Sequence, residues 1–341
     1  MFIDPHVHCR DGKQAYKETI KHALSVAERA GFTAIFDMPN TDPPITSREH
    51  VVERLEIAKK ANSPVFYGIH MAMTADISQI KETVDTYKEF FPQVVGFKLY
   101  AGHSVGDIVI IDIKDQQRIY ATLRDCGYEG VLVVHCEKES MLKPNLFDPK
   151  KPITQASARP PEAEVESLKD QIMLAQESGF EGTLHVTHIS VPEAVEIVNN
   201  AKRKMHITCA ATPHHLILDS SVMQTINGLL YKINPPIRTQ EMANKLLSCL
   251  KQGKIDWIET DHSPQTLDEK LNPPYMSGIP SLHYYPRFVE WLKAQFSEEQ
   301  IRDLTFNNIV KAYGISLKPR QAVPSLELGS EYPFDPFKGI F

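Results

Sequence analysis

The sequence has no apolar run that approaches the ~20 residues needed to cross a lipid bilayer, and it has no block of basic residues. Acidic residues outnumber basic residues by 43 to 37, so the formal net charge is −6. A mildly acidic chain of this kind is a weak candidate for nucleic-acid binding. Its first residues, MFIDPHVHCRDG, also lack the basic and apolar regions of a secretory signal. We therefore expect a cytoplasmic protein with neither a membrane nor a nucleic acid as its partner.

Cysteine is scarce and irregularly spaced. The chain has five cysteines, an odd number, and no two of them form a CxxC pair. This pattern argues against a disulfide framework and indicates reduced thiols, as in a cytosol. Cys9 and Cys136 directly follow histidines that are discussed below, and we interpret both as small buried residues that fill space.

Short apolar runs rich in Val, Ile and Phe recur along the chain, as is typical of buried parallel strands. The eight runs are residues 2–7, 33–38, 64–69, 94–99, 130–134, 182–186, 206–210 and 255–258. Segments with helical periodicity lie between several of them, for example residues 16–30 and 163–178, and a glycine follows each of these two. The alternation predicts a (β/α)₈ barrel or a doubly wound sheet.

The chain, at 341 residues, is longer than the ~250 residues of a typical (β/α)₈ barrel. The surplus lies in two proline-rich loops, residues 138–161 and 263–281, and in the C-terminal tail. Long loops inside a compact domain usually act as lids or binding loops. We predict one barrel domain over residues 1–318 and a tail over residues 319–341 that packs on it.

Ionisable side chains stand at or just after the C-terminal ends of five of the runs. They are His6 and His8 in the first run, Lys98 in the fourth, His135 after the fifth, His188 after the sixth and Asp261 after the eighth. In a parallel barrel these ends converge on one face, where active sites are built.

His6 and His8 alternate along a predicted strand, so their side chains point to the same side. Two imidazoles placed in this way can hold one divalent metal ion. Alone, the pair would more often be simply two polar residues at a strand end. Its coincidence with His135, His188 and Asp261 at equivalent barrel positions favours a metal site.

Lys98 is the unusual member of this group, because a buried lysine should have a depressed pKa. A neutral amine can add carbon dioxide to form a carbamate, whose two oxygens could bridge two metal ions. The alternatives are a lysine paired with a carboxylate and a lysine that binds an anionic substrate.

With these residues in view, the chain resembles the dihydroorotase branch of the metal-dependent amidohydrolase superfamily. The resemblance covers about the first 280 residues. It rests on DPHVHCRDG at 4–12, DMPNT at 37–41, GFKLYAG at 96–102, VVHCE at 133–137, HVTHIS at 185–190, TPHHL at 212–216, KINPPIR at 232–238, TDHSP at 260–264 and SGIPS at 277–281.

The resemblance implies a (β/α)₈ TIM barrel that holds two zinc ions per chain, bridged by a carboxylated Lys98 and a hydroxide. It implies reversible hydrolysis of the cyclic amide of dihydroorotate to N-carbamoyl-aspartate, a small-molecule reaction of pyrimidine biosynthesis, by a possible homodimer. The implied ligands of one zinc are His6, His8 and Asp261, and those of the other are His135 and His188. Asp261 would also transfer the proton. The implied substrate contacts are Arg10 and Asn40 at the carboxylate, and Asn234 and Gly278 around the ring.

The chain departs from the family pattern at three places. His6 lies five residues from the start, so we expect little or no accessory β-domain of the kind that many relatives carry. Gln265 stands where a substrate-contacting histidine is common, and we expect it to contact the substrate through hydrogen bonds. Ser281 replaces the commoner glycine.

Two other functions fit part of this pattern. A hydantoinase or allantoinase would use the same metal ligands, although Arg10 and Asn40 favour an acidic substrate. A non-catalytic, dihydroorotase-like structural subunit would usually have lost metal ligands, whereas this chain retains all six.

Overall fold

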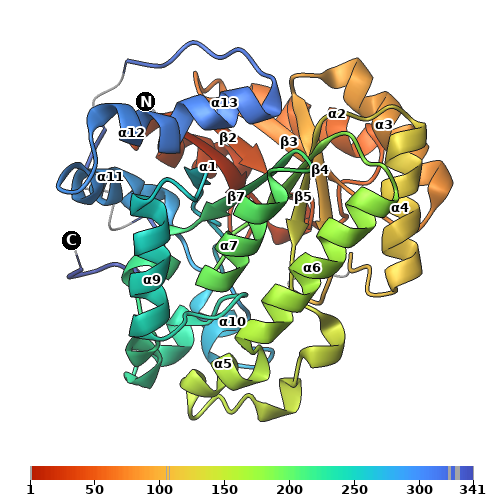
Figure 1. The fold of residues 1–341 in the computed structure, drawn as a ribbon. Coiled ribbons are helices and arrows are strands. Elements are labelled where there is room, and N and C mark those ends of the chain that lie inside the picture. The colour runs from red at the N-terminus through yellow and green to blue at the C-terminus, as the bar shows by residue number, and fades with distance from the viewer. Residues whose placement is uncertain (1, 105, 107, 322–323, 327–330, 341) are drawn as a thin grey trace.

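The computed structural model describes residues 2–104, 106, 108–321, 324–326 and 331–340. Eight parallel strands follow one another in chain order, β1 to β8, and helices surround them (Figure 1). The barrel closes where Val7 and His262 form a parallel bridge and the His8 amide donates to the His262 carbonyl at 2.8 Å. The predicted (β/α)₈ barrel is confirmed.

The strands match the apolar runs to within two residues at most ends. They are β1 (Phe2–Val7), β2 (Phe32–Asp37), β3 (Phe66–Ala72), β4 (Val94–Tyr100), β5 (Val131–His135), β6 (Thr183–Val186), β7 (Ile207–Ala211) and β8 (Trp257–Ile258). Among the described residues, every strand of two or more residues belongs to this barrel.

The helices lie between the strands and after β8. Those that follow the first five strands are α1 (Ile20–Arg29), α2 (Arg48–Ala61), α3 (Ile77–Phe90), α4 (Ile113–Asp125), α5 (Gln155–Ala158) and α6 (Pro161–Glu177). The later helices are α7 (Pro192–Ala201), α8 (Pro213–Ile217), α9 (Gln240–Lys251), α10 (Leu267–Leu271), α11 (Tyr285–Lys293), α12 (Glu298–Arg302) and α13 (Asn308–Tyr313). No described helix combines the length and apolar character that a membrane span requires.

The first helix begins four residues later than its periodicity predicted. The Thr19 hydroxyl caps α1 by accepting from the His22 amide at 3.1 Å, and the Asp11 carboxylate accepts from the Ile20 amide at 2.9 Å. These two side chains end the preceding turn and start the helix at Ile20, because each satisfies a backbone N–H of its first turn.

The core has two parts, as the barrel geometry requires. Alternate strand residues such as Phe36 and Val133 point inward and pack on Trp257, while the others pack on the helices. The segment 303–313, which includes α13, closes the barrel at the N-terminal ends of the strands through Phe306 and Tyr313.

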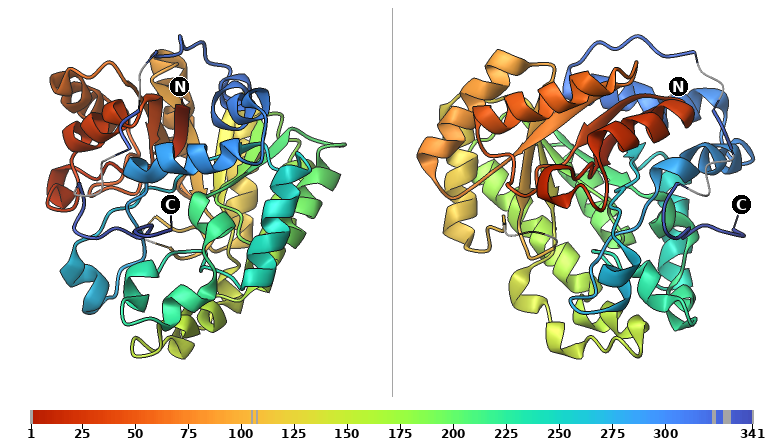
Figure 2. Two further views of the ribbon diagram at one scale, coloured as in Figure 1. Left: turned by 90° about the vertical axis from the view of Figure 1, so that its left-hand side faces the viewer. Right: turned by 180° about the vertical axis from the view of Figure 1, so that it is seen from behind.

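The described part of the C-terminal tail runs along the first two strands and α1 (Figure 2). The Arg320 guanidinium donates to the Phe32 carbonyl at 2.8 Å, and the Ser325 amide donates to the Arg29 carbonyl at 2.8 Å. Further on, Tyr332 is buried in the core. Residues 322–323, 327–330 and 341 of the predicted tail lie outside the described residues, and the division at residue 319 stays a prediction.

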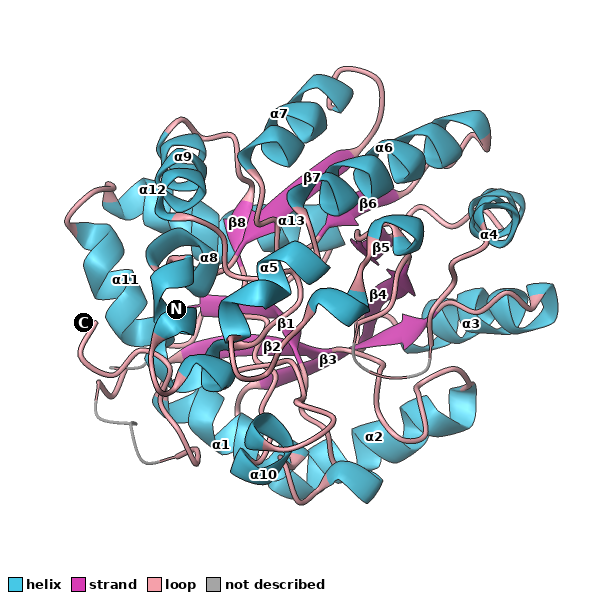
Figure 3. Ribbon diagram, turned by 90° about the horizontal axis from the view of Figure 1, so that it is seen from below, coloured by secondary structure: helices cyan, strands magenta, loops and turns pink. Residues whose placement is uncertain are grey.

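The two proline-rich loops lie over the C-terminal ends of the strands, the face seen in Figure 3. The first loop, 138–161, contains three 3₁₀ turns and α5, and the second, 263–281, contains α10. Both therefore lie where a barrel enzyme binds its substrate.

The two tryptophans of the chain provide a matched test of the inner core. Trp257 is fully buried inside the barrel, and Trp291 is only partly buried on α11. We expect Trp257→Ala to lower the free energy of unfolding by about 3–5 kcal/mol, because it leaves a cavity. Trp291→Ala should cost clearly less. Urea unfolding of the two variants measures this, and equal losses would contradict the described packing.

Candidate functional site

A small pocket opens at the C-terminal face of the barrel, and all six predicted metal-binding residues line it. The full lining is His6, His8, Asn40, Lys98, Tyr100, Ser104, His135, His188, Asn234, Asp261, Ser263, Ser277 and Gly278. Five strand ends deliver the six residues to one place, as the barrel topology predicted.

The first cluster in the pocket combines His6 and His8, at the end of the first strand, with Asp261, which follows the last strand. His6 Nε2 lies 3.3 Å and His8 Nε2 lies 3.2 Å from Oδ1 of Asp261, and ligand atoms of the three residues all lie within 4.8 Å of one another. Burial, above all other causes, lowers the pKa of His6 to about 4, which keeps its ring neutral as a metal ligand requires. Asp261 has a left-handed backbone, with φ of 48°.

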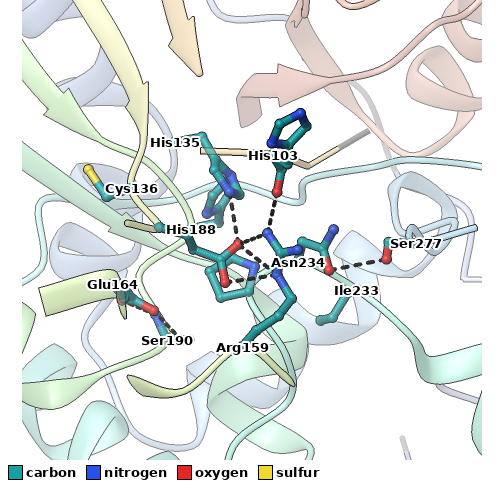
Figure 4. A network of polar contacts seen from close by, with 12 residues as sticks. His103, His135, Cys136, Arg159, Glu164, His188, Ser190, Ile233, Asn234 and Ser277 are labelled. Atoms are coloured by element: carbon teal, nitrogen blue, oxygen red, sulfur yellow. Dashed lines mark hydrogen bonds and ion pairs between the residues drawn. The ribbon is translucent and has the colours of Figure 1, made fainter. Parts of the chain in front are cut away.

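The second cluster pairs two histidines from neighbouring strands. His135 Nδ1 and His188 Nε2 lie 3.1 Å apart, so these two nitrogens face each other across the pocket. Figure 4 shows the two rings side by side. His188 also has a left-handed backbone, with φ of 38°. Such backbones are uncommon outside glycine and cluster at functional sites.

In three of the four histidines, one ring nitrogen contacts an oxygen atom of another side chain. His8 Nδ1 lies 2.7 Å from Oδ1 of Asn40, and His135 Nε2 lies 2.9 Å from Oε2 of Glu137. His6 Nδ1 contacts the Thr187 hydroxyl and lies 3.4 Å from the Glu259 carboxylate. One nitrogen of each ring is thus fixed and the other is left for the pocket, the usual arrangement of metal-binding histidines.

Lys98 lines the same pocket as both clusters and has no exposed surface, and its Nζ has no hydrogen-bond partner among the described residues. It lies 5.1 Å from the centre of the Tyr100 ring. Burial lowers the pKa of Lys98 to about 8, in the predicted direction. Of the earlier alternatives, pairing with a carboxylate is not seen, since no described carboxylate lies within ion-pair distance of Nζ.

These features fit a divalent metal site. Imidazole and carboxylate donors suit zinc and similar ions, and the pocket gathers both kinds in two adjoining groups. The unpartnered amine of Lys98 belongs to a residue that lines the same pocket as both groups. A buried amine without a partner is costly, so a function for it is to be expected.

Arg10 lies beside the pocket and hydrogen-bonds Ser263, one of its lining residues. The strand ends at Val7, and Arg10 takes a left-handed backbone with φ of 52°. Its Nη2 donates to the Ser263 hydroxyl at 2.6 Å, while its Nε and Nη1 have no partner among the described residues. The guanidinium is therefore a buried cation with two nitrogens that lack hydrogen-bond acceptors.

The other predicted substrate contacts divide into two kinds. Asn40 and Asn234 line the pocket, and Oδ1 of Asn234 accepts from Gln155 at 3.0 Å and from Ser277 at 3.1 Å (Figure 4). Gly278 also lines it, with φ of +128°, and a Cβ there would lie 2.4 Å from the Ser263 carbonyl oxygen. The pocket wall at this point therefore requires glycine.

Gln265 does not line the pocket, contrary to the expected substrate contact. It is buried, its Oε1 accepts from Lys17 at 2.9 Å, and its Nε2 donates to the Ser277 carbonyl at 2.9 Å. Both ends of the amide are used within the protein, so Gln265 supports the Ser277 segment instead of facing the pocket.

Glu259 is an important residue that the sequence analysis missed. Its buried carboxylate contacts His6 and the Thr187 hydroxyl, accepts from the His188 amide at 2.7 Å, and lies 3.3 Å from Nε2 of His185. Burial opposes its ionisation, but hydrogen bonds from His185 and His6 outweigh burial and hold the pKa of Glu259 well below its usual range. One anion thus touches a residue of each cluster.

Glu137 has the same role behind His135. Arg159 Nε lies 3.0 Å from both of its carboxylate oxygens, and the guanidinium also donates to the His103 carbonyl (Figure 4). Glu137 follows His135 by two residues and Glu259 precedes Asp261 by two, but β5 ends at His135 and β8 ends at Ile258. Strand alternation therefore gives no signal for either glutamate.

Comparison with known proteins relates the chain to one enzyme family by sequence. It is 30% identical over 332 residues to a dihydroorotase of Methanothermobacter thermautotrophicus, which covers 94% of this chain and 70% of that protein. It is 33% identical over 277 residues to a dihydroorotase of Staphylococcus aureus, which covers 80% of this chain. The chain spans 62% of the length of that second relative, and no family model matches the sequence.

Solved structures show the same barrel. L-hydantoinase (dihydropyrimidinase) from Arthrobacter aurescens superposes with a TM-score of 0.81 at 23% identity, covering 92% of this chain and 70% of that one. D-hydantoinase from a Thermus species gives a TM-score of 0.77 at 22% identity, with the same coverage. At this level of identity the likeness concerns the fold alone.

The role of Glu259 can be tested through metal binding. Glu259→Gln should weaken the binding of zinc about 10- to 100-fold, because replacing a residue that hydrogen-bonds a metal ligand typically lowers metal affinity by this factor. Competition with a chromophoric chelator measures the affinity. Glu166→Gln, in an exposed ion pair with Lys169, serves as the control. An unchanged affinity in Glu259→Gln, at an unchanged thermal midpoint of the metal-free protein, would count against the role.

Proposed function

The chain belongs to the dihydroorotase family, and on this premise we propose that it catalyses the reversible hydrolysis of the cyclic amide of dihydroorotate to N-carbamoyl-aspartate, a step of pyrimidine biosynthesis. The observation that carries the proposal is the pocket itself. Two clusters of metal-binding side chains lie next to Arg10, a buried guanidinium with two unpartnered nitrogens. A cyclic amide that carries a carboxylate suits this arrangement, because its amide can meet the two metal-binding clusters and its carboxylate can meet Arg10.

We propose that the protein holds two zinc ions. His6, His8 and Asp261 would bind one, His135 and His188 the other, and a carboxylated Lys98 would contact both. When bound, divalent ions act as Lewis acids that polarise an amide carbonyl and lower the pKa of water.

Lys98 is suited to the modification for two reasons. Its lowered pKa makes the unprotonated amine accessible near neutral pH, and only that form attacks carbon dioxide. The new N–C bond forms as the amine loses a proton, and the product is an anion with two oxygens. Two positive ions would stabilise this anion in a buried place where an ammonium ion has no partner.

Asp261 is the candidate for proton transfer. Its carboxylate lies next to both His6 and His8, and burial raises its pKa, which makes it a better base than an exposed aspartate. In the hydrolytic direction it takes a proton from the attacking water and delivers it to the leaving ring nitrogen. In the reverse direction the same carboxylate moves the proton back.

Arg10 is the candidate for binding the substrate carboxylate. A guanidinium forms charge-assisted hydrogen bonds with a carboxylate, and Arg10 has unpartnered donors on Nε and Nη1. A parallel pair of bonds would combine one of these nitrogens with Nη2, which already donates to Ser263. Asn40, Asn234 and the backbone at Gly278 line the space around the ring. In this arrangement, binding of the substrate carboxylate by Arg10 fixes the position of the ring amide relative to the groups that react with it.

The first test of the function compares four compounds on one metal-analysed preparation: dihydroorotate, N-carbamoyl-aspartate, hydantoin and allantoin. We expect turnover of the first two only. Arg10→Ala should lower kcat/KM for dihydroorotate by about 10²-fold or more, since charge-assisted hydrogen bonds contribute about 1.5–3 kcal/mol each. Arg10→Lys should rescue only part, because an ammonium group lacks the planar fork. If Arg10→Ala leaves the best substrate unaffected, the carboxylate assignment is wrong and a neutral cyclic amide becomes the better proposal.

A second test addresses Lys98. Lys98→Ala should lose metal and activity together, and added short carboxylic acids should restore part of both by occupying the vacated space. Elemental analysis and turnover are measured on the same sample, with close to two zinc ions expected in the wild type. Full metal content with full activity in Lys98→Ala would refute the bridging role.

A further inference from the structure

A second and larger pocket lies directly outside the metal-binding pocket. Its volume is about 690 Å³, and it shares Ser104, Asn234 and Ser277 with the inner pocket. We call this outer pocket the vestibule. Its walls come mostly from the two proline-rich loops and from the segment around residue 232, and Gln14, His103, Ser104 and Gly106 complete them. The shared residues place it against the metal-binding pocket.

Lys232 supplies a cation to the vestibule without a nearby counter-ion. Its Nζ donates to the Ser277 hydroxyl at 3.0 Å and lies 5.1 Å from the centre of the Phe147 ring. No described carboxylate lies within ion-pair distance of it. The other ionisable side chains of the vestibule are engaged: Arg159 with Glu137, and His103 with Glu139 at 2.9 Å.

The surroundings of Lys232 strengthen its attraction for an anion. Apolar walls that include Leu142, Phe147 and Met276 lower the local dielectric and focus the field of a charge. The formal net charge of the chain is −6, so the protein as a whole repels anions, and a local cation at the entrance offsets that repulsion. Burial and the nearby Arg159 lower the pKa of Lys232 to about 8, so the amine still carries its charge at pH 7.

We propose that Lys232 forms an anion-binding position at the entrance of the site, which holds the carboxylate of the incoming substrate before Arg10 receives it. The inference rests on the proposed function, since it needs an anionic substrate. Ser277 and Asn234 line both pockets and mark the path between the two cations. Lys232 therefore acts on encounter, while Arg10 acts on the positioned ring.

This role predicts a specific kinetic signature. A residue that acts on encounter changes kcat/KM more than kcat, and its effect weakens as salt screens the charge.

The experiment compares wild type, Lys232→Met, Lys232→Arg and the control Lys150→Met at pH 7, over ionic strengths from about 0.02 M to about 0.5 M. Lys150 is exposed and lies in the same loop as Phe147, so its variant makes the same charge change away from the vestibule lining. We expect Lys232→Met to lower kcat/KM about 10-fold at low salt and to flatten its salt dependence, with a smaller change in kcat. Lys232→Arg should retain most of kcat/KM, and Lys150→Met should match the wild type.

Three results would overturn the inference while leaving the proposed function intact. They are a wild-type kcat/KM and salt dependence in Lys232→Met, an equal fall in kcat and kcat/KM, and a loss in Lys232→Arg as large as that in Lys232→Met. The last would assign the effect to the contacts with Ser277 and Phe147 instead of the charge. If the metal-loaded wild type turns over neither dihydroorotate nor N-carbamoyl-aspartate, the proposed function itself fails, and the anionic-substrate role of Lys232 fails with it.

Discussion

The site depends on the closure of the barrel, because its first and last strands supply one cluster together. The seam between them is held by hydrogen bonds: the His8 amide donates to the His262 carbonyl, and the Thr260 amide donates to the buried Asp4 carboxylate at 3.1 Å. This contact brings Asp261 against histidines 253 and 255 residues away in sequence. Every other feature of the pocket is arranged around that meeting point.

Buried charge then fixes the side chains within the closed barrel. Glu259 and Glu137 hold imidazoles from behind, one at each side of the pocket. The left-handed turn at Arg10 is held similarly, because Arg54 donates to its carbonyl and pairs with Asp37, which in turn accepts from the Cys9 amide at 2.8 Å. A backbone of this kind persists only when its surroundings determine it from several directions. The buried ion pair of Arg54 and Asp37 therefore stabilises the left-handed backbone at Arg10.

Much of this arrangement could be predicted from the sequence, and the exceptions have physical reasons. Strand periodicity located the barrel and placed His6, His8, Lys98, His135, His188 and Asp261 on one face, since topology alone makes strand ends converge. The conformation of Arg10 could not be predicted in this way, because the strand ends at Val7 and Arg10 has a left-handed backbone. The placement of Gln265 and the network of Glu259 depend on contacts between segments far apart in the chain, which no local pattern encodes.

The meeting of first and last strands also has a consequence for biosynthesis. During translation Asp261 leaves the ribosome more than 250 residues after His6 and His8. At the usual rate of ~5–20 residues per second this delay is on the order of tens of seconds. The proposed metal position at His6, His8 and Asp261 is incomplete throughout that interval, so it cannot serve as a nucleus for co-translational folding. Completion of this position instead reports that the whole barrel has been made and closed.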